Sequence, residues 1–110
     1  MYRGSRFSVP DVDVTLLYFD DCPNWKLADR RLVELASEGL DITVTRREVH
    51  SAEEAERLGF RGSPSILLDG VDLFPAPRAV VGLTCRVYST PDGLAGVPTL
   101  DQLRAVLACA

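Results

Sequence analysis

The sequence predicts one α/β domain built around a mixed sheet. Strand-like and helix-like segments alternate along the first half of the chain, and the turn signal Asp69-Gly70 separates two short apolar runs in the second half. Alternating elements favour parallel strands with right-handed crossovers, whereas a two-residue turn joins antiparallel strands. A chain of 110 residues suits a single domain, 1–110, and we expect residues 1–11 to form a flexible arm.

The first strand and the first helix have clear local signals. Residues 12–19 form a near-continuous apolar run rich in β-branched and aromatic side chains, which is typical of a strand buried on both faces. Pro23 suits the first turn of a helix, because its missing N–H is no loss there. Apolar side chains then recur on one helical face to about Ser37, and Gly39 is a suitable stop.

The later strands are shorter. Residues 42–49 alternate well enough for a second strand, and residues 65–68 form a third. The two-residue turn joins this third strand to residues 71–74 in a hairpin. Residues 83–88 are a further extended piece, within an insertion that precedes the last helix.

Two capping boxes mark the remaining helices. Ser51 with Glu54 predicts a short helix that ends at Gly59. Thr99 with Gln102 predicts a closing amphipathic helix. The predicted order is therefore β-α-β-α-β-β-α, with the insertion before the last helix.

Composition and charge narrow the classes of function. The formal net charge of −4 disfavours a nucleic-acid partner, because phosphate binding requires a basic face. No apolar segment is long enough to span a membrane, and residues 1–10 lack the pattern of a secretory signal. Three widely spaced cysteines are a poor disulfide framework, and the single His50 gives no zinc-ligand spacing. We therefore expect a cytoplasmic protein with reduced thiols, no metal, no cofactor and no membrane partner.

Cys22 is the first candidate for chemistry. It lies at the junction of the first strand and the first helix, where helical N–H groups and the helix dipole stabilise a thiolate, the nucleophilic form. Asp20 and Asp21 act in the opposite direction, because neighbouring carboxylates disfavour a further negative charge. The sequence leaves open which effect is larger, and a small buried residue is the alternative role for Cys22.

The stretch that leads into the third strand resembles the approach to the cis-proline of the thioredoxin-like superfamily. That superfamily typically has a Gly-x-Arg-Gly-x-Pro-Thr pattern followed by an apolar strand. The matching positions here are Gly59, Arg61, Gly62 and Pro64. Ser65 replaces the usual threonine, and the distance back to Cys22 is also similar. The resemblance covers about residues 12–74 and, more weakly, the last helix.

The resemblance implies a thioredoxin-like fold in which Pro64 is cis, packs beside Cys22 and shapes the groove that receives the partner's sulfur. Ser63 and Trp25 are the neighbouring candidates for substrate binding, although Trp25 also fits the core stripe of the first helix. Members typically carry Cys-x-x-Cys, whereas this chain has Trp25 at the position of the second cysteine. Exchange would therefore use Cys22 as a single nucleophile, with Cys85 or an external thiol resolving the mixed disulfide.

Whether Cys85 can reach Cys22 depends on the strand pairing. If residues 83–88 pair antiparallel with residues 65–68, Cys85 lies on the order of 10 Å or more from Pro64, at about 3.3 Å per residue. If the two-residue turn makes the hairpin instead, the chain has returned toward Pro64 and Cys85 can approach Cys22. We favour the hairpin, and a buried core thiol is the alternative role for Cys85.

The other candidate site residues also have ordinary structural roles as alternatives. We expect His50 to be a surface histidine and Cys109, next to the end of the chain, to be a bystander. Arg78, Arg86 and Tyr88 are candidates to bind the carboxylates of a glutathione-like thiol, with solvated side chains as the default.

Three hypotheses on function follow. The first is a thiol–disulfide oxidoreductase or thiol-transfer protein that acts through Cys22 on protein or low-molecular-weight thiols. The second is a non-catalytic thioredoxin-fold binding module, with the segment 74–98 as its partner surface. The third is a metal or iron–sulfur site shared between two chains through Cys22.

Overall fold

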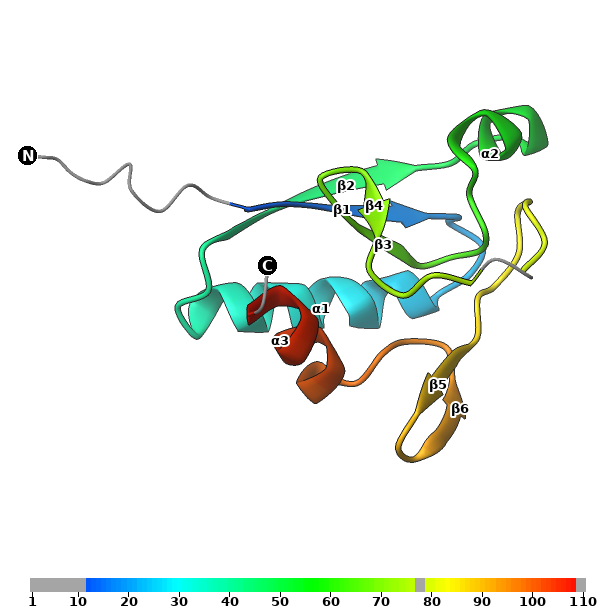
Figure 1. The fold of residues 1–110 in the computed structure, drawn as a ribbon. Helices are drawn as coiled ribbons and strands as arrows, with labels where there is room; N and C mark the ends of the chain where they lie inside the picture. The colour runs from blue at the N-terminus through cyan, green and yellow to red at the C-terminus, as the bar shows by residue number, and fades with distance from the viewer. Residues whose placement is uncertain (1–11, 77–78, 109–110) are drawn as a thin grey trace, which may run out of the picture.

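The computed structural model describes residues 12–76 and 79–108, so the predictions for the arm 1–11, for Arg78 and for Cys109 lie outside the described residues. Strands and helices alternate through the first half of the chain (Figure 1), in the order β1 (Val12–Tyr18), α1 (Asn24–Ser37), β2 (Ile42–Glu48), α2 (Ala52–Leu58), β3 (Ser65–Leu68) and β4 (Val71–Asp72). The second half adds β5 (Tyr88–Thr90), β6 (Gly93–Ala95) and α3 (Leu100–Ala108).

The main sheet has four strands in the order β2-β1-β3-β4. β1 and β2 run parallel, with Val14 opposite Val44, whereas β3 is antiparallel both to β1 and to β4. The predicted α/β class with a mixed sheet is therefore confirmed. None of the helices in the described part of the chain combines the length and the apolar character that a membrane crossing requires.

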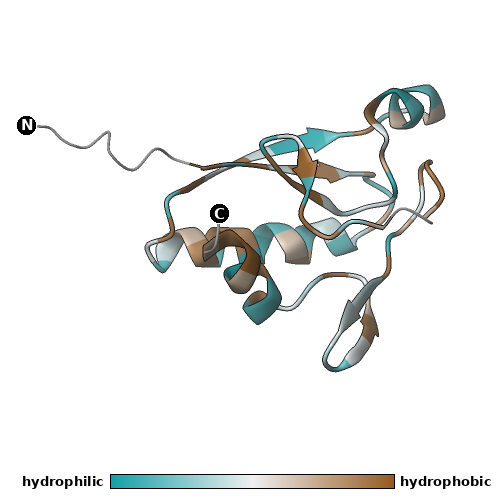
Figure 2. Ribbon diagram, viewed as in Figure 1, coloured by the Kyte–Doolittle hydropathy of each residue, from teal (hydrophilic) through white to brown (hydrophobic). Residues whose placement is uncertain are grey.

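Apolar side chains pack on both faces of the sheet. α1 and α3 cover one face (Figure 1), and the buried residues there are Val14, Leu16, Ala28, Leu32, Leu35, Ile66, Val97, Leu103 and Leu107. α2 packs near one end of the other face, where the buried residues are Leu17, Val49, Ala55 and Phe60. β1 and β3 are largely hydrophobic, whereas α2 is largely hydrophilic (Figure 2). α2 is therefore anchored by few side chains.

The hairpin between β3 and β4 forms at the predicted turn. Asp69 and Gly70 both have positive φ angles, of 48° and 85°, as a two-residue type I′ turn requires. β4 is shorter than the predicted strand 71–74, although the Leu73 amide still donates a hydrogen bond to the Ile66 carbonyl, 3.0 Å away. The hairpin therefore turns the chain back along β3 and toward Pro64.

Both predicted capping boxes are confirmed. The Ser51 hydroxyl accepts a hydrogen bond from the Glu54 amide at 3.1 Å, while the Glu54 carboxylate accepts from the His50 amide at 2.8 Å. At the start of α3, the Thr99 amide donates to the Gln102 side chain at 2.9 Å, and the Gln102 amide donates to the Thr99 hydroxyl at 3.1 Å. These caps satisfy backbone donors that a helix start leaves without partners.

The extended piece expected over residues 83–88 is not one continuous strand: Cys85 makes an isolated bridge with Ser63, and only Tyr88 belongs to a strand. Tyr88 instead begins a small separate hairpin, β5–β6, which lies on the same side of the sheet as α1 and α3 (Figure 1). The Gln102 side chain donates a hydrogen bond to the Ser89 carbonyl at 3.0 Å and so ties this hairpin to α3. This bond joins the insertion to the last helix.

Candidate functional site

A disulfide joins Cys22 to Cys85 across 63 residues of sequence, with the two Cα atoms 5.8 Å apart. The sequence led us to expect reduced thiols, whereas this structure holds the pair in its oxidised form. The hairpin arrangement brings the two cysteines together, as favoured from the sequence. Cys22 is completely buried, whereas Cys85 is exposed, so the alternative role of Cys85 as a buried core thiol is also wrong.

Local turns place Cys22 just before the first helix. The Cys22 amide donates a hydrogen bond to the Phe19 carbonyl at 3.0 Å, which turns the chain sharply at the end of β1. Pro23 follows with φ −71° and ψ −11°, a conformation its ring presets, and the Lys26 amide donates to its carbonyl at 3.1 Å. Cys22 thus stands at the positive end of the dipole of α1.

The backbone of Ser63 holds the segment that carries Cys85. The Ser63 amide donates a hydrogen bond to the Thr84 carbonyl at 2.7 Å, and the Ser63 carbonyl accepts one from the Arg86 amide at 2.9 Å. These two bonds form an isolated parallel bridge between Ser63 and Cys85. They fix the residues on both sides of Cys85.

Ser63 also contacts the segment that carries Cys22. Its hydroxyl accepts a hydrogen bond from the Phe19 amide at 3.0 Å, and its carbonyl oxygen lies 3.6 Å from Cys22 Sγ. The Ser63–Pro64 peptide bond is cis, as the resemblance implies. Ser63 and Pro64 are both buried beside the disulfide, so the structure places these predicted substrate-binding residues out of solvent contact.

Gly62 allows the chain before β3 to pack closely against the segment that carries Cys85. Its φ of +110° favours glycine, and a Cβ atom there would lie 3.0 Å from the Arg86 Cβ atom. Any larger residue would therefore push the segment that carries Cys85 away from β3.

Arg86 is a buried cation next to Cys85 in the sequence, and only 2% of its side chain is exposed. Its guanidinium donates to both carboxylate oxygens of Asp72, at 2.7 and 3.3 Å, and to the Phe74 carbonyl. It also donates to the Ser65 hydroxyl at 3.2 Å. Through these bonds, Arg86 holds the insertion before α3 against β3 and β4. The suggestion that Arg86 binds an external carboxylate is wrong, since the carboxylate it binds is that of Asp72.

Tyr88 is likewise buried rather than solvated, which corrects the prediction for this residue. Its hydroxyl donates a hydrogen bond to the Pro64 carbonyl, and the Arg86 guanidinium lies 4.7 Å from the centre of its ring. Burial raises the pKa of Tyr88 above its ordinary value, although the positive charge of Arg86 opposes the rise. Tyr88 therefore acts as a neutral hydrogen-bond donor that fastens the insertion to the residue after Ser63.

Trp25 packs as a core residue. Its ring stacks on Tyr18, with centroids 4.1 Å apart, and contacts the cluster between the sheet and α1. The indole N–H is buried and has no hydrogen-bond partner among the described residues. The structure thus supports the core role weighed from the sequence for Trp25.

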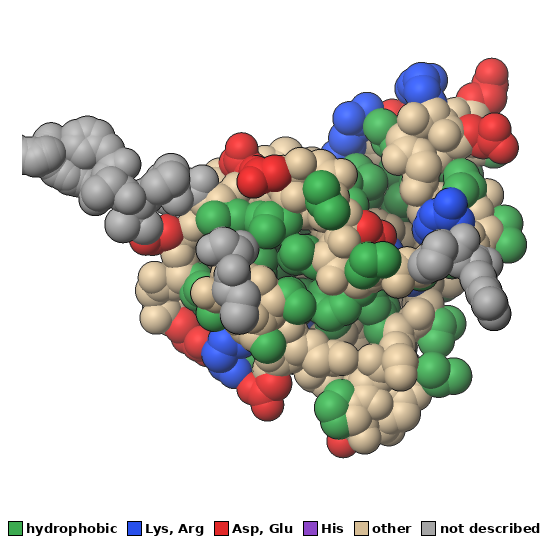
Figure 3. Space-filling model, viewed as in Figure 1, with side chains coloured by type: hydrophobic (Ala, Val, Ile, Leu, Met, Phe, Trp, Pro, Cys, Tyr) green, Lys and Arg blue, Asp and Glu red, His purple; other side chains and the backbone are tan. Residues whose placement is uncertain are grey.

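The remaining candidates contribute little. His50 is exposed, as predicted, and its imidazole Nδ1 lies 3.7 Å from a carboxylate oxygen of Glu48. Within residues 12–76 and 79–108, no group of three or more histidine, cysteine, aspartate or glutamate side chains could hold a metal ion. On the visible face, charged side chains gather at the periphery and around α2, while hydrophobic side chains gather between the sheet and the helices (Figure 3).

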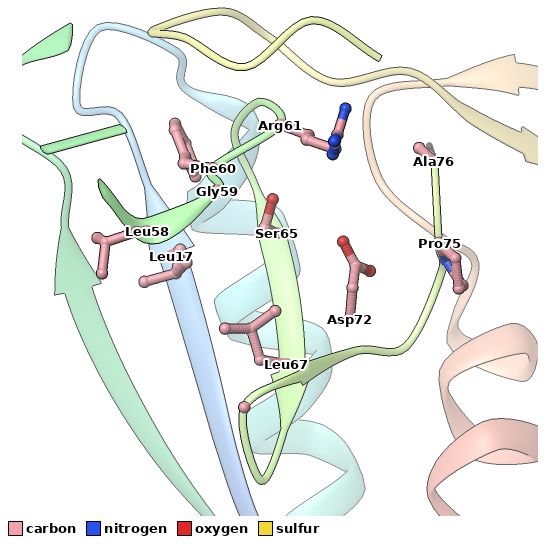
Figure 4. A pocket seen from close by; sticks show the side chains of 11 residues that line it. Leu17, Leu58, Gly59, Phe60, Arg61, Ser65, Leu67, Asp72, Pro75 and Ala76 are labelled. Atoms are coloured by element: carbon pink, nitrogen blue, oxygen red, sulfur yellow. The ribbon is translucent and has the colours of Figure 1, made fainter. Parts of the chain in front are cut away.

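A groove opens beside β3 and β4. Its apolar side is formed by Leu17, Phe60 and Leu67, and its polar side by Arg61 and Asp72 (Figure 4). Asp72 binds Arg86, and Arg61 donates a hydrogen bond to the Ala79 carbonyl. Neither cysteine lines this groove, so it is separate from the disulfide.

Comparison of the chain with protein-family models and with curated protein sequences found no match.

Proposed function

We propose that this chain is a thioredoxin-like thiol–disulfide oxidoreductase whose exchanging pair is Cys22 and Cys85. Its substrates are thiols or disulfides, either of proteins or of low molecular weight. One observation carries the proposal: a cysteine at the start of a helix forms a disulfide with an exposed cysteine, directly beside Ser63 and Pro64.

The fold supports this assignment. The sheet order β2-β1-β3-β4, with β1 parallel to β2 and the other pairs antiparallel, agrees with the fold that the resemblance implies. Trp25 occupies the position of the usual second cysteine, and Cys85 supplies a second sulfur from the insertion. A dithiol–disulfide pair is thus kept, although the two residues are far apart in the sequence.

The chemistry is a two-electron exchange. When the pair is reduced, it transfers two electrons and two protons to a partner disulfide and becomes the Cys22–Cys85 disulfide, and the reverse reaction oxidises two partner thiols. A catalytic disulfide of this kind is transient. It is therefore compatible with a reducing compartment, and a cytoplasmic location remains part of the proposal.

A second candidate is a non-catalytic binding module in which the disulfide is structural. The burial of Cys22 and the separation of 63 residues favour this alternative, because a cross-link over a long loop stabilises a small domain strongly. The two candidates differ in whether the disulfide exchanges with external thiols at a useful rate.

A turnover assay distinguishes them. We expect the protein to accelerate the reduction of insulin disulfides by dithiothreitol, and we expect Cys22→Ser and Cys85→Ser to bring the rate down to that of dithiothreitol alone. Cys109→Ser is the matched control, because it removes a thiol and leaves the pair intact. A wild-type rate no higher than that of dithiothreitol alone would favour the structural disulfide.

A further inference from the structure

We infer that Cys85, rather than Cys22, is the sulfur that exchanges with the partner, and that Cys22 is the leaving and resolving thiol. The inference rests on the proposed function and reverses the roles expected from the sequence. The two ends of the disulfide differ sharply in access: Cys22 is 0% exposed, whereas Cys85 is exposed. Thiol–disulfide exchange requires the attacking thiolate to reach the sulfur it attacks, so access decides between them.

The structure shows why Cys22 is out of reach. The Ser63 carbonyl oxygen lies 3.6 Å from Cys22 Sγ, and Ser63 and Pro64 are buried themselves. Ser63 cannot move aside easily, because its amide and carbonyl are both bonded to the backbone on either side of Cys85. A thiol from solvent therefore meets Cys85 first.

The position of Cys22 also suits a leaving group. It lies one residue before Pro23, the N-cap of the 14-residue helix α1, whose dipole stabilises negative charge at this end. A more stable thiolate leaves faster in thiol–disulfide exchange. The helix dipole thus favours the same direction of attack as access does, while the carboxylates of Asp20 and Asp21 oppose it, so access carries the inference.

The exchange then proceeds in balanced steps. A partner thiolate attacks Cys85 Sγ and forms a mixed disulfide, the Cys22–Cys85 bond breaks, and its electron pair leaves on Cys22, which takes up a proton from solvent. A second thiolate of the partner then attacks the partner sulfur of the mixed disulfide. The two partner sulfurs become a disulfide, and Cys85 leaves as a thiolate. In the reducing direction, the Cys85 thiolate attacks the partner disulfide, and Cys22 then attacks Cys85 Sγ to release the partner.

The test locates the first mixed disulfide. Oxidised protein carrying Cys109→Ser is mixed with glutathione in the presence of iodoacetamide, and peptide mass spectrometry then identifies the modification on each cysteine. The expected product carries glutathione on Cys85 and the alkyl group on Cys22. Glutathione on Cys22 with alkylated Cys85 would overturn the inference but leave the proposed function standing. A disulfide that stays intact under these conditions would overturn both.

A kinetic measurement gives an independent readout. The reduced double variants Cys22→Ser/Cys109→Ser and Cys85→Ser/Cys109→Ser each retain one thiol of the pair. The helix dipole favours the thiolate at Cys22, but burial blocks access to it, so we expect the exposed Cys85 thiol to react with 5,5′-dithiobis(2-nitrobenzoate) about tenfold faster or more. A faster reaction at Cys22 would contradict the inference.

Discussion

Reduction of the Cys22–Cys85 disulfide is expected to lower the free energy of unfolding by about 4 kcal/mol, because the bond closes a loop across 63 residues and so restricts the unfolded chain. Cys85→Ser is expected to cause a similar loss without any reductant, since the exposed side chain makes a small contribution of its own. Urea unfolding of the oxidised wild type, the reduced wild type and the variant measures this effect.

The variant also supplies the control for the reductant. Dithiothreitol should leave the midpoint of Cys85→Ser unchanged, because this variant has no Cys22–Cys85 bond to reduce. Cys109→Ser should keep the full response to dithiothreitol. Equal midpoints for oxidised and reduced wild type would show that the bond does not hold the insertion to the rest of the fold.

Replacement of Arg86 is expected to be similarly costly. Arg86→Met fills much of the same space but removes the guanidinium donor of the Asp72 carboxylate and of the Phe74 carbonyl, and leaves that carboxylate only the bond from the Phe74 amide at 2.8 Å. Removing one partner of a buried ion pair typically costs about 3–5 kcal/mol, and we expect the lower end of this range because the Asp72 side chain left behind is 26% exposed. The loss should appear as a lower urea midpoint, measured on oxidised protein so that the disulfide contributes equally.

Arg104→Met is the matched control. Arg104 also donates to carboxylates, those of Glu38 at 2.9 Å and Asp101 at 2.5 Å, but its side chain is 39% exposed. Exposed ion pairs contribute about 0.2–1 kcal/mol, so this variant should differ little from wild type. Equal losses for the two variants would mean that burial of Arg86 is not what makes its ion pair important.

The local elements could be predicted from the sequence because short-range chemistry determines them. The turn at Asp69-Gly70 needs positive φ angles, and the capping boxes at Ser51 and Thr99 follow from the spacing of side-chain acceptors. The β5–β6 hairpin was missed although Pro91-Asp92-Gly93 is a turn signal. Its strands have only three residues each and lack a long apolar alternation.

The site could be predicted only in part. Cys22 and Pro64 carry local signals, and the hairpin made an approach of Cys85 geometrically possible. The opposite exposure of the two cysteines and the burial of Arg86 depend on long-range packing of the insertion, which no local pattern encodes. Arg86 was expected at the surface because arginine is rarely buried without a partner, and Asp72, its partner, lies in β4.

The role of Ser63 also could be predicted only in part from the sequence. Its position before the cis peptide bond follows from the resemblance, but its hydrogen bonds to Phe19, Thr84 and Arg86 join three separate parts of the chain. Ser63 is fully buried and makes several hydrogen bonds, so it positions the disulfide and does not contact a substrate from solvent. Only the folded structure shows this role.

The reduction potential of the Cys22–Cys85 pair tests the central claim most directly. The Cys109→Ser protein would be equilibrated in glutathione and dithiothreitol redox buffers, and the oxidised fraction read by alkylation and mass spectrometry. Our account predicts a potential between about −270 and −120 mV, the span of known thiol–disulfide oxidoreductases. A potential below about −300 mV would contradict it, because the pair would then behave as a structural disulfide.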